Sequence, residues 1–166
     1  MALLQKVPFL NRLLYAMGNA GYNMLERVLT TWLMYYYVAP PESGRNVLVG
    51  AFIFGGVMFF GRVVDAVADP LISVWTDNAR FKRGRRWPFM FWGGLPLAVV
   101  SVALFYPPLA NESILNAVYL ALMVGLFFFF FTFYVCPYLA LIPELARNDR
   151  ERVDLTTLQA VFMLLG

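Results

Sequence analysis

Histidine is absent from this chain of 166 residues, and cysteine occurs once, at Cys136. Without imidazoles or a pair of thiols, histidine relays, zinc clusters and disulfide frameworks are excluded. Charged residues are scarce too, at 14% of the chain, where soluble domains carry roughly 25%. The sequence also shows no nucleophile–base pair and no glycine-rich phosphate loop. We therefore predict that the protein is not an enzyme and holds no cofactor and no metal.

Apolar residues make up 61% of the sequence and gather in long runs. A helix needs about 20 apolar residues to cross a bilayer. The runs predict an all-α integral membrane protein with four complete spans, at about 13–38, 47–74, 88–105 and 115–141, and a fifth that begins near residue 155. The chain reaches residue 166 inside this fifth segment, so we expect it to be part of something longer or to depend on a partner.

Basic residues are concentrated in the loops on one side of the predicted membrane. Ten lie in these loops, and the loops of the opposite side hold only Arg45. Because cytoplasmic loops carry the excess of Lys and Arg, the N-terminus is predicted to be cytoplasmic. The basic charge thus reflects membrane topology, and no nucleic-acid partner is expected. The ten residues are Lys6, Arg12, Arg80, Lys82, Arg83, Arg85, Arg86, Arg147, Arg150 and Arg152.

Two carboxylates and one guanidinium interrupt the second predicted span. Arg62, Asp65 and Asp69 have the spacing i−3, i, i+4, which places them on one face of a helix. Ionisable groups at membrane depth are costly and usually mark functional sites. The two carboxylates can bind a small cation or share a proton, or they can form a structural ion pair with Arg62 or Arg27.

A second polar stripe runs along the first predicted span. Asn19, Asn23, Glu26 and Arg27 have the spacing i, i+4, i+7, i+8, which follows one face of a helix. The stripe is a candidate substrate surface. Alternatively, the neighbouring Glu26 and Arg27 neutralise each other or brace the span.

Several motifs follow one another along the whole chain. They are LMYYY at 33–37, GRVVDAVADP at 61–70, RFKRGRRWPF at 80–89, PYLALIPEL at 137–145 and DRER at 149–152. Together they resemble the N-terminal part of the glycoside–pentoside–hexuronide:cation symporters, the melibiose permease group of the major facilitator superfamily. The resemblance implies a partial N-terminal six-helix bundle of a twelve-span transporter in a bacterial inner membrane. The other half would be a C-terminal continuation or a membrane partner protein.

The resemblance also implies roles for individual residues. In the family, two aspartates of the second span and a threonine of the fourth bind the coupling cation, and the matching residues are Asp65, Asp69 and Thr132. Sodium-using members place an asparagine where this chain has Ala68, so the coupling ion is expected to be H⁺ more than Na⁺. The loops after the second and fourth spans are expected to gate the cytoplasmic side. The gating candidates are Asp77, Arg80, Arg83, Arg85, Arg86, Arg147, Arg150 and Arg152.

The expected sugar site departs from the family pattern. The aspartates that anchor sugar hydroxyls in the permease correspond to Asn23 and Val135, and an arginine of the fifth span corresponds to Gln159. Arg27 and Arg62 instead offer guanidinium groups, which pair well with carboxylates. We expect cation-coupled transport of a sugar-like, uronide or other small organic solute by alternating access. The alternative is a non-transporting structural subunit of a larger membrane complex. The residues expected to face the solute are Asn19, Asn23, Glu26, Arg27 and Arg62.

Overall fold

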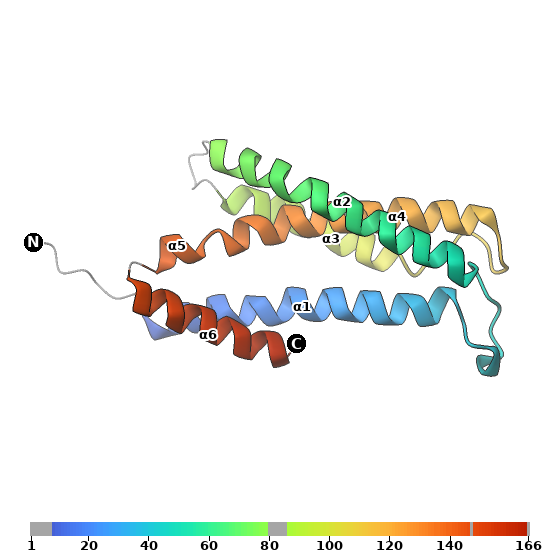
Figure 1. The fold of residues 1–166 in the computed structure, drawn as a ribbon, viewed down its shortest axis with the longest axis horizontal. Coiled ribbons are helices and arrows are strands. Elements are labelled where there is room, and N and C mark those ends of the chain that lie inside the picture. The colour runs from blue at the N-terminus through green and yellow to red at the C-terminus, as the bar shows by residue number, and fades with distance from the viewer. Residues whose placement is uncertain (1–7, 80–85, 147, 166) are drawn as a thin grey trace, which may run out of the picture. The chain divides into compact units, whose positions relative to one another are not determined.

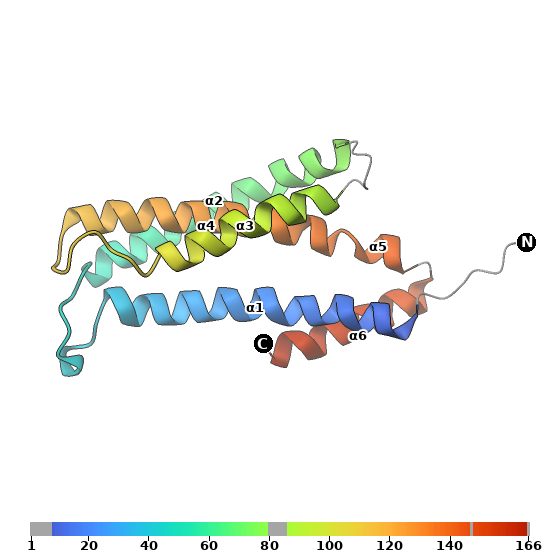
Figure 2. The same ribbon diagram turned by 180° about the vertical axis from the view of Figure 1, so that it is seen from behind.

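All regular structure is helical in the computed structural model, which describes residues 8–79, 86–146 and 148–165. Figures 1 and 2 show the helices from opposite sides. The prediction of an all-α protein is confirmed. The long helices are α1 (Phe9–Tyr37), α2 (Ala51–Asn78), α3 (Trp87–Ala103), α4 (Ile114–Leu139) and α6 (Asp149–Leu165), and the short segments are the 3-10 turn η1 (Pro41–Ser43) and α5 (Ile142–Leu145).

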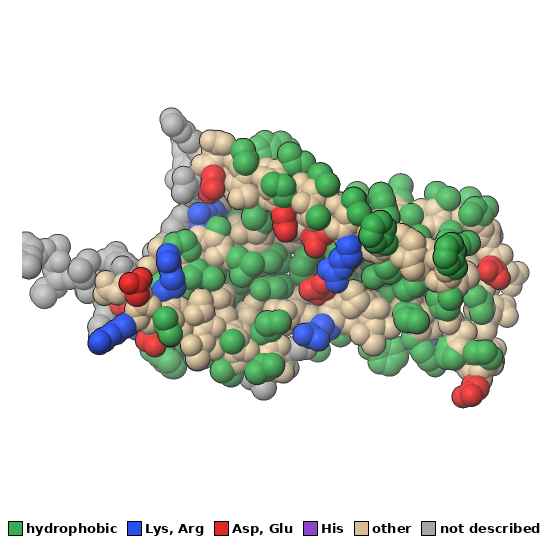
Figure 3. All heavy atoms as spheres, viewed as in Figure 1, with side chains coloured by type: hydrophobic (Ala, Val, Ile, Leu, Met, Phe, Trp, Pro, Cys, Tyr) green, Lys and Arg blue, Asp and Glu red, His purple; other side chains and the backbone are tan. Residues whose placement is uncertain are grey.

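Two of the described helices, α2 and α4, are long and apolar enough to cross a membrane. Helix α3 is apolar as well but has only 17 residues. Helix α1 has 29 residues, roughly 44 Å of helix, but polar side chains interrupt its apolar surface. Large apolar side chains of α2 and α4 are exposed, among them Phe52, Phe59 and Val118, as on a surface that meets lipid. Figure 3 shows apolar side chains spread over this face, with charged side chains near its middle and at its left end.

The connection between α1 and α2 uses apolar residues that the sequence assigned to the second span. Helix α2 begins at Ala51 and not near residue 47. The backbone N–H groups of Leu48 and Val49 donate to the carbonyl oxygen of Tyr37 at 3.0 and 3.2 Å. These bonds turn the chain back over the end of α1, so both residues are buried without being helical. Gly44, with φ of 62°, ends the preceding turn in a conformation that glycine adopts without strain.

Helix α6 begins earlier than its apolar segment. The sequence placed the start of this element near residue 155, whereas the helix begins at Asp149. Asp149 and Glu151 lie in its first turn, where carboxylates are stabilised by the positive end of the helix dipole. Charged residues therefore form the first turns, and the apolar residues follow on the same helix.

The chain divides into two compact units. The first unit comprises Met1–Val28 and Leu139–Gly166, and the second comprises Leu29–Tyr138. Helix α1 contributes its first part to the first unit and its last turns to the second. In the first unit, α1 and α6 are joined by an ion pair between Arg12 Nη1 and Asp154 Oδ2 at 3.7 Å, and Leu155 of α6 is buried.

The core of the second unit is formed by close contacts of α2 and α3 with α4. A Cβ atom at Gly61 would lie 2.5 Å from Val124 and 2.7 Å from Phe128, so only glycine lets α2 approach α4 so closely. The Tyr37 hydroxyl at the end of α1 donates to the carbonyl oxygen of Leu104, at 2.8 Å, and ties α1 to the end of α3. The second unit thus has a closely packed interface at which α2 side chains face α4.

Candidate functional site

The candidate site lies where α2 crosses the middle of α4. Asp65 follows Gly61 by one helical turn and is half-buried, with 27% of its side chain exposed. Thr132 of α4 is buried at 2% exposure. Its hydroxyl donates to Asp65 Oδ1 at 2.6 Å, the short distance expected of a bond to a charged acceptor. The structure thus brings together two of the three residues that the resemblance assigned to the cation.

Arg62 adds a positive charge beside this pair. Its Nη1 atom lies 3.8 Å from Asp65 Oδ2, and its Cζ atom lies 4.8 Å from the centre of the Phe128 ring. The first distance is longer than a charge-assisted hydrogen bond, and 52% of the Arg62 side chain is exposed. Asp65 is therefore held tightly by Thr132 and more loosely by Arg62.

Asp69 lies one helical turn beyond Asp65 and is exposed. No hydrogen bond or ion pair joins it to another described residue. Between the two aspartates, Ala68 is buried at 3% exposure and offers no oxygen atom. Pro70 follows within α2 and has no N–H for the carbonyl of Ala66, which leaves that backbone oxygen without its usual helical donor. The site thus has two carboxylates on neighbouring turns of α2 and one hydroxyl from α4.

The polar stripe of α1 lies in the first unit, and half of it is used for packing. Asn19 is buried and its Nδ2 atom donates to the carbonyl oxygen of Gln159 in α6 at 2.6 Å. Asn23 is also buried, and its Nδ2 atom donates back to the Asn19 carbonyl at 2.8 Å. Glu26 is half-buried and Arg27 is exposed. Asn19 thus links α1 to α6, and Asn23 bonds within α1, neither of which was predicted from the sequence.

Two gating candidates meet between α2 and α3. Arg86 Nη2 lies 3.5 Å from Asp77 Oδ1, and the arginine is buried although the aspartate is exposed. This pair joins the end of α2 to the start of α3. Arg150 and Arg152 are exposed on the first turn of α6. The remaining candidates, Arg80, Arg83, Arg85 and Arg147, lie outside the described residues.

Phe128 is a neighbour of Arg62 that was not predicted from the sequence. Gly61 lies against Phe128, Arg62 lies over the Phe128 ring, and Asp65 contacts Thr132. The residue numbers rise together along α2 and α4, so the two helices run in the same direction. This parallel register places Phe128 one turn before Thr132. The sequence contains five successive phenylalanines, at 127–131, and only the register of α2 on α4 shows which of them meets the arginine.

A family model described as MFS/sugar transport protein matches residues 14–166. The chain belongs to this family. An uncharacterized symporter of Synechocystis sp. is 30% identical over 98% of this chain and 30% of its own length. The isoprimeverose transporter of Lactiplantibacillus pentosus is 26% identical over 96% of this chain and 32% of its own length. The lactose permease of Lactobacillus helveticus is 26% identical over 92% of this chain and 25% of its own length.

These relatives confirm the resemblance to the N-terminal part of the sugar symporters of the major facilitator superfamily. The family is one of membrane transporters, so the chain belongs in a lipid bilayer and its relatives carry small solutes. The chain spans between a quarter and a third of the length of the three relatives described above.

Proposed function

We propose that this chain carries the cation-binding part of a cation-coupled secondary transporter of a small organic solute. The observation that carries the proposal is the hydrogen bond from Thr132 to Asp65, with Asp69 one turn away. It unites on two helices the residue types that the resemblance assigns to the coupling ion. Membership of a family of membrane transporters supports the same function.

The charges suggest how the site would respond to a cation. Two carboxylates one turn apart repel each other, and a bound cation would neutralise part of their charge. Arg62 lies at 3.8 Å from Asp65 and competes for the same carboxylate. When a cation binds, we expect Arg62 to be released toward the solute. Occupancy of the site would then bias the rocking of two helical halves that alternating access requires.

We propose a proton as the coupling ion in preference to sodium. Small hard cations are held by several oxygen ligands. Ala68 lies on the packed face of α2 between the aspartates and supplies none. A proton needs only one carboxylate that can take it up, so the missing ligand does not weaken proton binding.

Transport by the intact protein in proteoliposomes tests the coupling. Uptake of a transported solute is expected to be driven by an inward pH gradient in sodium-free buffer, and to be abolished in Asp65→Asn. Glu112→Gln, at an exposed carboxylate in the α3–α4 connection, is the matched control and should retain uptake. Strict dependence on sodium would exclude the proton, and uptake by Asp65→Asn at the normal rate would exclude the site.

We propose that the solute is acidic, such as a uronide, or an amphiphile. The two positions that anchor hydroxyls in the permease are Asn23 and Val135 here, and neither carries a carboxylate. Val135 is apolar and buried, and the Asn23 side chain is already bonded to Asn19. A sugar hydroxyl left unpaired costs roughly 1–3 kcal/mol. Arg27 and Arg62 are exposed and can pair with an acid. The relatives are named for isoprimeverose and lactose, so this proposal rests on the residues of this chain.

Thermal-shift binding by the intact protein tests the solute class. Neutral sugars, uronides and lysolipids would be compared, and the uronide or the lysolipid is expected to raise the melting temperature most. Tight binding of a neutral galactoside that survives Arg27→Ala and Arg62→Ala would contradict the acidic solute.

The second hypothesis, a structural subunit, receives no support from the relatives described above.

A further inference from the structure

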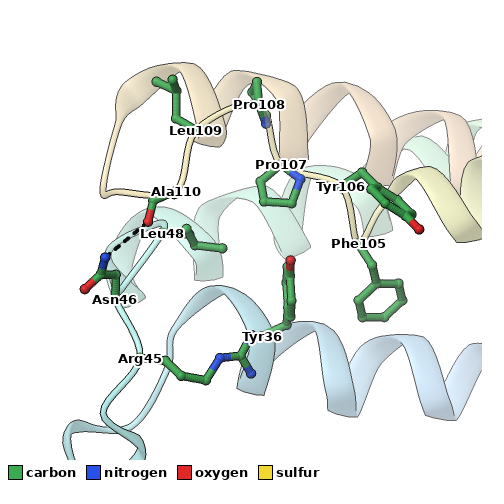
Figure 4. A pocket seen from close by; sticks show the side chains of 10 residues that line it. All are labelled: Tyr36, Arg45, Asn46, Leu48, Phe105, Tyr106, Pro107, Pro108, Leu109 and Ala110. Carbon is green, nitrogen blue, oxygen red and sulfur yellow. Dashed lines mark hydrogen bonds between the residues drawn. The ribbon is translucent and has the colours of Figure 1, made fainter.

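A pocket of about 600 Å³ opens at the end of the second unit (Figure 4). It lies where the α1–α2 and α3–α4 connections meet, at the opposite end of α2 and α3 from the basic segment 80–86. Its volume lies within the range of roughly 300–1,000 Å³ that is typical of small-molecule sites. The residues that give the wall its chemical character are Tyr36, Arg45, Asn46, Phe105, Tyr106 and Pro107.

The wall is assembled from two loops that are held together by specific contacts. Asn46 Nδ2 donates to Asn111 Oδ1 at 3.1 Å and lies 3.4 Å from the carbonyl oxygen of Ala110. The Tyr36 ring meets Phe105 edge to face, with 5.6 Å between the ring centres. These contacts join α1 and its following loop to the segment after α3. The pocket is therefore a structured feature of the second unit.

Two polar groups of this wall, the Arg45 guanidinium and the Tyr36 hydroxyl, are not used in hydrogen bonds or ion pairs with the described residues. Arg45 Cζ lies 5.0 Å from the Tyr36 ring centre, and the arginine has no carboxylate partner among the described residues. Within the same residues, the Tyr36 hydroxyl has no hydrogen-bond partner; Figure 4 shows it directed toward the 105–107 segment. Tyr106 is 71% exposed, so its ring is open to solvent. The acidic residues of the two loops, Glu42 and Glu112, do not line the pocket.

We propose that this pocket is an entry site for a sugar that carries a carboxylate or sulfonate group. The acid pairs with Arg45 and accepts a hydrogen bond from the Tyr36 hydroxyl, and the apolar face of the sugar ring packs on Tyr106. Guanidinium groups match planar acids, and aromatic rings offer an apolar face with a polar edge. The proposal rests on the acidic solute and the topology proposed above, which place the pocket on the outer side, where a weak site collects solute before transport.

A phosphate headgroup of a neighbouring lipid carries the same kind of anion but no sugar ring for the aromatic wall. The test therefore compares both sources. In the intact protein, Cys136→Ser removes the native thiol and Leu109→Cys, at a pocket residue, receives an environment-sensitive fluorophore. Sodium methyl glucuronide, methyl glucoside and short-chain phosphatidylglycerol are titrated at constant ionic strength. Melting temperatures show whether each variant is folded.

A saturable response to the glucuronide, much weaker for the glucoside and the lipid, is expected. Arg45→Gln should weaken glucuronide binding by about fivefold, the scale of a solvent-exposed ion pair. Glu42→Gln, in the same loop outside the pocket, should bind at least as tightly as the parent. Asp69→Asn should lose coupled uptake but keep the pocket response, because Asp69 is not a pocket residue.

The entry site would be overturned by the absence of a saturable response, by equal responses to glucuronide and glucoside, or by unchanged glucuronide affinity in folded Arg45→Gln. A response to the lipid alone would assign the pocket to a headgroup and also overturn the proposal. If the parent takes up glucuronide without a pocket response, the entry site fails and the proposed function stands. If the pocket responds but no glucuronide is taken up, the acidic solute fails and the entry role fails with it.

Discussion

A buried hydroxyl and a half-buried carboxylate connect the two helices of the candidate cation site. Thr132 makes the shorter contact with Asp65, at 2.6 Å, and Arg62 makes the longer one, at 3.8 Å. Without the hydrogen bond from Thr132, Arg62 would be the remaining partner of the Asp65 carboxylate. The Thr132 hydroxyl therefore influences whether Asp65 pairs with Arg62 or stays available to a cation.

Replacing Thr132 by Val keeps the volume of the side chain and removes this donor. We expect the protein to lose about 1 kcal/mol of stability, the usual scale of such bonds in membranes and in water. Proton-coupled uptake should fall as well. Thr132→Ser keeps the hydroxyl and should retain uptake, which distinguishes the bond from packing. Equal uptake by the Val and Ser variants would show that the hydroxyl has no role in coupling.

Asp69 should matter more for coupling than Thr132. Asp69→Asn removes a charge, whereas Thr132→Ala removes only a neutral ligand. We therefore expect Asp69→Asn to abolish gradient-driven uptake and Thr132→Ala to reduce it. Counterflow of labelled solute, which needs no gradient, measures whether the variants still bind and exchange solute. The order of severity would be refuted if Thr132→Ala were the more damaging change.

Asn19 tests whether the α1 stripe serves packing or solute. Its Nδ2 atom bonds the carbonyl oxygen of Gln159, and both residues are buried. Asn19→Ala should lower the melting temperature by an amount that corresponds to about 1 kcal/mol. Arg27→Gln, at the exposed end of the stripe, should leave the melting temperature unchanged and weaken binding of an acidic solute. A stable Asn19→Ala protein with weakened solute binding would favour solute contact at Asn19.

At the scale of helices, α2 and α4 run parallel and touch where a glycine faces bulky side chains. Gly61 meets Val124 and Phe128 one turn before Asp65 meets Thr132. The close approach at the glycine brings the two polar side chains within hydrogen-bond distance. A change of helix separation at Gly61 should therefore lengthen the hydrogen bond between Thr132 and Asp65 at the cation site.

Gly61→Ala tests this dependence on helix separation. The new Cβ atom would lie 2.5 Å from Val124, which forces α2 and α4 apart or displaces both side chains. We expect a loss of about 1–3 kcal/mol in stability, as for other overpacked cores, together with weaker coupling. Gly56→Ala is the matched control, because outside the adjoining backbone of α2 no atom of the described structure lies within 4 Å of the added Cβ. Equal melting temperatures for the two variants would contradict the tight α2–α4 contact.

At the scale of the whole molecule, the basic residues predict which side of the membrane each loop occupies. With a cytoplasmic N-terminus, the η1 turn and the α3–α4 connection face outward. In a Cys136→Ser background, cysteines at Ser43 and Asn111 should react with an impermeant thiol reagent added to intact cells. A cysteine at Arg83 should react only after permeabilisation. The reverse pattern would overturn the orientation and place the pocket of Figure 4 on the cytoplasmic side.

Helix class and the location of charges follow from the sequence alone. Long apolar runs leave helices as the available structure for a chain in lipid, because every backbone group must then be bonded internally. The i, i+4 spacing places Asp65 and Asp69 on one side of α2 without any tertiary information. The resemblance of the motifs to a family of sugar transporters also assigns Thr132 to the cation site without any tertiary information.

Contacts between helices depended on the tertiary structure. The register of α2 on α4 decided that Thr132 reaches Asp65 and that Phe128 reaches Arg62. The structure also shows that Asn19 is buried and bonds the Gln159 carbonyl oxygen of α6, a contact that residue spacing could not predict. Residue spacing describes one helix at a time. Register and burial depend on how the side chains of two helices pack against each other. That packing depends on the size of facing residues, as where Gly61 leaves room for Val124 and Phe128.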